Sequence, residues 1–145
     1  MNKKYRFKTE PYQHQRAALG ASWDKPEFAY FMEMGTGKSK VLIDNLAILY
    51  DYGYVDSALI LAPKGVYRNW AELEFPKHLP DHIQHRIVCW SPNPNKEEKE
   101  KLFSLFESTD DLVIFIMNIE ALSTKKGTSF AEKFLISRLS LLAVD

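Results

Sequence analysis

Hydrophobic and polar positions alternate along the chain in blocks that predict strands and helices in turn. Largely apolar runs that we predict to be strands occupy residues 28–32, 57–63, 86–90, 112–117 and 140–145. Between these runs apolar positions recur at helical spacing, and we predict helices within residues 11–19, 38–50, 64–75, 96–106, 118–122 and 130–138. The stretches 76–86 and 123–129 are polar and contain proline or glycine, so we predict loops there.

The alternation of strands and helices predicts a three-layer α/β domain with a mainly parallel sheet. The runs 57–63 and 112–117 are apolar at successive positions, as expected of strands that helices cover on both faces. At 145 residues the chain is one domain or part of one, and it is long enough to bury a sizeable core.

Composition narrows the class of protein only slightly. Basic and acidic residues number 19 each, so no overall charge favours nucleic acid, and any such contact must be local. The single cysteine, Cys89, excludes an internal disulfide. No apolar run approaches the length of a membrane span, and no apolar stretch follows the basic N-terminus as in a signal peptide. We therefore expect a soluble, intracellular protein with no membrane partner.

The turn between the first predicted strand and the helix after it carries the strongest chemical signal. It reads Met34-Gly35-Thr36-Gly37-Lys38-Ser39. The start of a helix favours an anion, and glycines let the backbone close around phosphate oxygens. In such a turn the lysine pairs with the β- and γ-phosphates and the serine hydroxyl ligates Mg²⁺, so we predict a site for ATP and Mg²⁺. Met32 stands where the full phosphate-loop pattern has its first glycine, and a glycine-rich turn with a solvated lysine is the alternative.

Two residues far from this turn in the sequence could complete a nucleotide site. Asp145 follows the last apolar run, and a carboxylate there can hold the water shell of a Mg²⁺ near Ser39. By itself it would be only an acidic chain end. Gln13 lies at the start of the first predicted helix, and its amide has the donor and the acceptor needed to read an adenine edge. A lone glutamine is more often a solvated surface residue.

The order of the short motifs resembles the first motor domain of superfamily-two helicases, and among them the Swi/Snf-type translocases. The motifs are, in chain order, Pro11-Tyr12-Gln13, then residues 32–39, then Leu61-Ala62-Pro63 with residues 69–72, then residues 111–114 with 118–122, and finally Leu142-Ala143-Val144-Asp145. That branch commonly lacks the first glycine of the phosphate loop, although it has an acidic residue where this chain has Met32. The resemblance covers nearly the whole chain and implies a P-loop, RecA-like form of the three-layer fold.

The resemblance also implies roles for individual residues. Gln13 would read the adenine, residues 34–39 would bind the phosphates, and Lys38 and Asp145 would be catalytic. Ser39 and Asp145 would hold the metal. Residues that would lie against the nucleic-acid backbone are Pro63, Lys64 and Asn69. The implied function is that of the ATP-binding part of an ATP-dependent nucleic-acid helicase or double-stranded DNA translocase, with DNA and a second RecA-like domain as partners.

The end of the chain departs from this family. Asp145 is the last residue, so we expect residues 1–145 to be the N-terminal portion of the motor domain, truncated at the Walker B strand. The glutamate that orients the attacking water would follow, and the second domain would bring arginines. Without them we expect weak nucleotide binding and negligible hydrolysis. A small-molecule P-loop kinase and a non-catalytic nucleotide-binding interaction module are the alternative functions.

Overall fold

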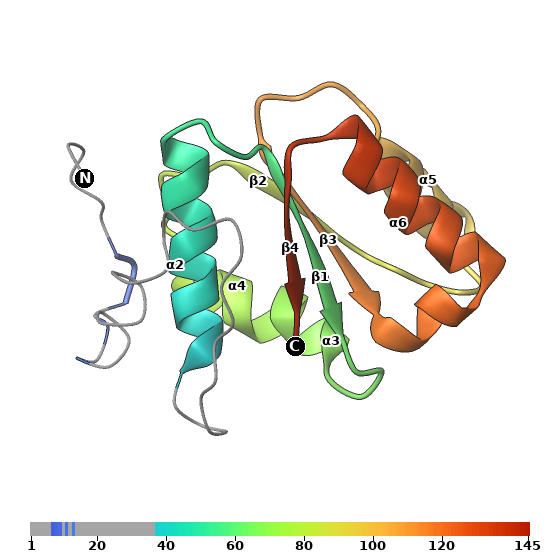
Figure 1. Cartoon of the computed structure of the whole chain (residues 1–145), viewed down its shortest axis with the longest axis horizontal. Helices are drawn as coiled ribbons and strands as arrows, with labels where there is room; N and C mark the ends of the chain where they lie inside the picture. The colour runs from blue at the N-terminus through green and yellow to red at the C-terminus, as the bar shows by residue number, and fades with distance from the viewer. Residues whose placement is uncertain (1–6, 10, 12, 14–36) are drawn as a thin grey trace.

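The computed structural model describes residues 7–9, 11, 13 and 37–145. Its architecture is α/β, with four parallel strands in one sheet and helices on both faces of the sheet (Figure 1). The predicted α/β class and the parallel sheet are therefore confirmed. The strand predicted at 28–32 and most of the helix predicted at 11–19 lie outside the described residues.

The sheet has the strand order β2-β3-β1-β4. At its centre are β1 (Ser57–Ala62) and β3 (Leu112–Asn118), with β2 (His85–Cys89) beside β3 and β4 (Ser140–Val144) beside β1. Every residue of β1 is buried, as its uninterrupted apolar sequence predicted. Leu61 lies opposite both Met117 and Val144, so the carboxyl ends of three strands meet at one edge of the sheet.

Helices cover the two faces of the sheet in separate layers (Figure 1). One face carries α2 (Lys38–Asp51) and a helical segment made of α3 (Tyr67–Asn69), a π-helical turn (Trp70–Glu74) and α4 (Phe75–His78). The other face carries α5 (Lys96–Ser104), a 3₁₀ turn (Ile119–Ser123) and α6 (Lys125–Ser137). An apolar core lies against each face, the first around Ile43, Leu46, Ile60 and Phe75, the second around Leu59, Leu105, Phe115 and Phe134.

The predicted loop at 123–129 is wrong, because α6 already begins at Lys125. Thr124 caps this helix, since its Oγ1 accepts a hydrogen bond from the Gly127 N–H at 3.0 Å. Gly127, Thr128 and Ser129 are weak helix formers, and the cap offsets their poor propensity.

Three other predicted boundaries need smaller corrections. The helix predicted to end at residue 75 continues to His78, because Pro76 lies in the first turn of α4, where its missing N–H is tolerated. The helix predicted at 118–122 is a 3₁₀ turn over Ile119–Ser123. The strand predicted at 86–90 is shifted by one residue and is β2.

Candidate functional site

The first turn of α2 and the end of β4 meet at the carboxyl edge of the sheet (Figure 1). There the Nζ of Lys38 lies 2.6 Å from the Oδ1 of Asp145. The Asp145 N–H donates to the Leu61 carbonyl at 2.7 Å, which extends the pairing of β4 with β1 by one residue. The sheet itself therefore fixes the backbone that carries this carboxylate.

Trp70 holds the second oxygen of the same carboxylate. Its indole Nε1–H donates to the Oδ2 of Asp145 at 3.2 Å, and the ring is buried against Phe75 with 6.0 Å between ring centroids. Trp70 is therefore a core aromatic that also contacts Asp145, and nothing in the motif around residues 69–72 predicts this contact. A buried indole N–H usually finds an acceptor, and that is the only sequence signal that could have suggested the contact.

Gly37 forms the start of α2 in the left-handed conformation, with φ 80°. Glycine adopts this conformation without the steric cost that a side chain would add. No side chain of the described residues caps the helix at this end. Met34, Gly35 and Thr36 lie outside the described residues.

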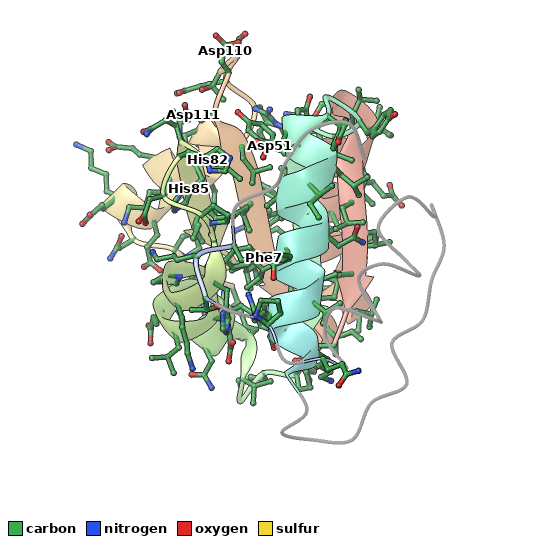
Figure 2. The ribbon with its side chains drawn as sticks, turned by 90° about the vertical axis from the view of Figure 1, so that its left-hand side faces the viewer. Phe7, Asp51, His82, His85, Asp110 and Asp111 are labelled. Carbon is green, nitrogen blue, oxygen red and sulfur yellow. The ribbon has the colours of Figure 1, made fainter. Side chains whose placement is uncertain are left out.

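A second lysine in the first turn of α2, Lys40, is buried and forms an ion pair inside the protein. Lys40 and Asp44 are 3% and 1% exposed, and the Lys40 Nζ lies 2.8 Å from the Asp44 Oδ2. The Phe7 ring lies over the same ammonium group, with 5.1 Å to its centroid (Figure 2). The Lys38 side chain, in contrast, is 42% exposed, so of the two it is the lysine that an anionic ligand can reach.

The residues at this edge fit a magnesium nucleotide. Ser39 lies in the same turn as Lys38, and its hydroxyl and the Asp145 carboxylate are the hard oxygen donors that Mg²⁺ prefers. Among the described residues no three His, Cys, Asp or Glu side chains gather as a metal group. A Mg²⁺ here would thus depend on few protein ligands and on phosphates and water, as is usual for this ion.

The candidate nucleic-acid residues lie at the same edge of the sheet. Pro63 and Lys64 directly follow β1 and are exposed, and Asn69 ends α3 and is also exposed. The Lys64 N–H donates to the Glu120 Oε1 at 3.3 Å, and the Asn118 Nδ2 donates to the Oε2 of the same carboxylate at 3.2 Å. These hydrogen bonds lower the pKa of Glu120, and the bond from Asn118 has the largest effect. Glu120 therefore joins the loops that follow β1 and β3.

Gln13 is exposed. In the part of the chain that the structure describes, no hydrogen bond joins it to Lys38 or Asp145. The structure thus brings Lys38 and Asp145 into contact, with Ser39 beside Lys38 in the first turn of α2 and with Pro63 and Lys64 on the same edge. The adenine-reading role of Gln13 stays a prediction.

A second polar cluster lies at the opposite end of α2 (Figure 2). The His82 Nε2 lies 3.0 Å from the Asp51 Oδ2, and the Tyr50 hydroxyl donates to the Asp110 carbonyl at 2.6 Å. Burial raises the pKa of Tyr50, and the charges of Asp111, Asp110 and Asp51 add to the effect. These contacts join the C-terminal end of α2 to the loops before β2 and β3, away from Lys38.

The fold and the site together define the class of protein: an α/β domain with a parallel sheet and a lysine–aspartate pair at its carboxyl edge. No protein-family model matches the chain, and no curated protein matches it either. In the described part of the chain, no helix has the length and apolar character needed to cross a membrane. A functional assignment therefore depends on the geometry of the site.

Proposed function

We propose that the chain is the ATP-binding part of an ATP-dependent nucleic-acid helicase or double-stranded DNA translocase, in which hydrolysis is coupled to movement on DNA. The observation that carries this proposal is the 2.6 Å contact between Lys38 and Asp145 at the start of α2. Open α/β sheets bind their ligands at the carboxyl edge, and a helix start favours phosphate. The RecA-like, P-loop form of the fold and the assignment of residues 1–145 to the N-terminal portion of the first motor domain belong to the same proposal.

Under this proposal, each candidate residue at the carboxyl edge of the sheet has a role in binding the nucleotide or the metal. Lys38 would hold the β- and γ-phosphates, with the backbone of residues 34–37 around them. Ser39 and Asp145 would hold Mg²⁺, which when bound neutralises phosphate charge. Trp70 would keep the Asp145 carboxylate from rotating, since it already bonds one of the two oxygens. Gln13 would read the adenine, and a second RecA-like domain would complete the motor.

The ion pair is suited to an exchange of partners. Lys38 is 42% exposed, and a pair this exposed contributes only about 0–1 kcal/mol to stability. A phosphate oxygen offers the ammonium group a charge-assisted hydrogen bond of the same kind as the one to Asp145. Lys38 can therefore move from Asp145 to a phosphate at little cost, which leaves the carboxylate for the metal.

Titration of the 145-residue chain with Mg²⁺ and a fluorescent ATP analogue tests the nucleotide site. Lys38→Ala removes the ammonium group, and hydrogen bonds to charged groups contribute about 1.5–3 kcal/mol, so we expect affinity to fall about 10-fold to 150-fold. Lys101→Ala is the matched control, because Lys101 lies on α5, on the other face of the sheet, and its only described ion pair is with Glu97 at 3.8 Å. The control should bind like the wild type.

Two results would contradict the proposed nucleotide site. One is a wild-type chain that does not bind the analogue in the presence of Mg²⁺. The other is Lys38→Ala binding as tightly as Lys101→Ala. The nucleic-acid partner is tested separately with labelled duplex DNA, where binding should weaken with rising salt and with Lys64→Ala.

A further inference from the structure

A hollow of about 550 Å³ opens at the carboxyl edge of the sheet, beside the candidate nucleic-acid residue Lys64. Its lining includes the largely apolar side chains Tyr67, Trp90, Pro92 and Ala121. The volume lies in the range of small-molecule sites, which are about 300–1,000 Å³. A phosphate group alone would fill only a small part of this space and would leave its apolar walls in contact with water.

Three basic side chains line the same hollow. They are Lys64, which follows β1, Arg68 in α3, and Lys126 in the first turn of α6. None of the three forms an ion pair with a described residue. The carboxylate in the lining, Glu120, accepts hydrogen bonds from Asn118 and from the Lys64 backbone. The hollow therefore combines apolar walls with positive charge that an anion can approach.

Arg68 adds a planar group to this combination. Its guanidinium lies over the Tyr67 ring, with 5.3 Å from Cζ to the centroid. The Tyr67 hydroxyl donates to the Trp90 carbonyl at 3.0 Å, so the ring that supports Arg68 is fixed. A guanidinium plane is a common partner for a stacked nucleobase, and its charge also attracts phosphate.

We infer that the hollow accepts one unpaired base of the bound nucleic acid, while flanking phosphates contact Lys64, Arg68 and Lys126. The inference rests on the proposed nucleic-acid function and adds a base-binding site to it. Contact with the backbone alone would use the three cations but not the apolar walls. A base supplies the ring that covers these walls, and base stacking on such surfaces tolerates any sequence.

Gly65 offers a way to fill the hollow without removing charge. It is part of the lining, its φ is not in the left-handed region, and a Cβ built there meets no atom within 4 Å. Gly65→Trp should therefore fold and place an indole at the hollow. Val66→Trp is the matched control, because Val66 is 39% exposed but is not part of the lining. Arg68→Lys, as a second variant, keeps the charge and removes only the planar group.

The experiment measures fluorescence anisotropy of two single-stranded thymidine oligonucleotides of equal length, one intact and one with abasic sites. Both carry the same phosphates, so their difference reports the bases. Stacking energies correspond to about a 5-fold to 150-fold preference of the wild type for the intact strand. Gly65→Trp should lower affinity for the intact strand to the abasic value, Val66→Trp should change neither, and Arg68→Lys should reduce the preference. Lys126→Ala should weaken both strands alike.

The possible failures are distinguishable. Equal binding of the two oligonucleotides by the wild type overturns the base site and leaves the proposed function in place, as does an undiminished preference in Gly65→Trp. Absence of binding to both single-stranded oligonucleotides overturns the inference, and the proposed nucleic-acid function fails with it only if labelled duplex DNA is not bound either. The ATP titration with Lys38→Ala tests the nucleotide site independently of all these results.

Discussion

Replacement of Gly127 by alanine tests how the loop after β3 is held against α6. Gly127 is buried in the first turn of α6, and a Cβ there would collide with the Ala121 carbonyl oxygen. It would also lie 2.8 Å from the Ala121 carbonyl carbon and 2.9 Å from the Thr124 Oγ1. Since two of these three atoms belong to the backbone, a side-chain rotation cannot relieve the contact.

The expected loss of stability follows from the groups that must move. Forcing extra volume into a packed site costs about 1–3 kcal/mol. The Thr124 Oγ1 also caps Gly127, and a lost cap costs about 1 kcal/mol. The better helix propensity of alanine returns at most about 1 kcal/mol. We therefore expect Gly127→Ala to lower the free energy of unfolding by about 1–3 kcal/mol.

Urea denaturation followed by circular dichroism measures this difference. Gly65→Ala is the matched control, because the same methyl group meets nothing within 4 Å at that position. An exposed change of this kind should stay within about 0.5 kcal/mol of the wild type. If Gly127→Ala proves as stable as Gly65→Ala, the close packing of the 3₁₀ turn on α6 is not what fixes this loop.

Two further predictions concern buried titratable groups in α2 and α4. Lys40→Met removes the ammonium group that pairs with Asp44, and it should lower the free energy of unfolding, measured by urea denaturation, by about 3–5 kcal/mol. Lys40→Met combined with Asp44→Leu should recover most of this loss. Burial lowers the pKa of His78 to about 4, with Lys40 and Lys77 adding to the effect, so the unfolded chain binds this proton near pH 6.5 and the folded chain only near pH 4. The free energy of unfolding should therefore fall by up to about 3 kcal/mol as the pH drops from about 6.5 to about 4. In His78→Gln the free energy of unfolding should depend less on pH in this range. If the dependence on pH is unchanged in the variant, the loss comes from other groups.

The elements with strong periodicity were predictable from the sequence. α2 was predicted at 38–50 and spans Lys38–Asp51, and β1 and β3 fall within a residue of their apolar runs. The start of α6 was not predictable, because Lys125 to Ser129 have the composition of a loop. The start of α6 depends on the Thr124 cap, which is local in sequence, and on the packing of Gly127 against Ala121, which is a contact with the preceding 3₁₀ turn.

The candidate site was predictable in part for similar reasons. Residue type and position after a strand singled out Lys38, Ser39 and Asp145, and the structure brings Lys38 and Asp145 into contact. The bond from Trp70 to Asp145 could not be predicted, since it depends on how the π-helical turn packs beside the end of β4. The cations of the hollow come from two separate stretches, residues 64–68 and the start of α6, and the sequence does not show that these stretches converge.

The pairing of Asp145 with the Leu61 carbonyl has a consequence for the order of events during folding. The carboxylate takes its place only when β4 has aligned with β1, a pairing between segments about eighty residues apart, such as Ser57 with Ser140. Contacts of such separation are slow to form because a long loop must close first. A ligand held by Lys38 and Asp145 together would favour the aligned state by mass action. Under the proposed function this ligand is a nucleotide, which would then stabilise chains whose last strand is in register and would not stabilise chains in which it is out of register.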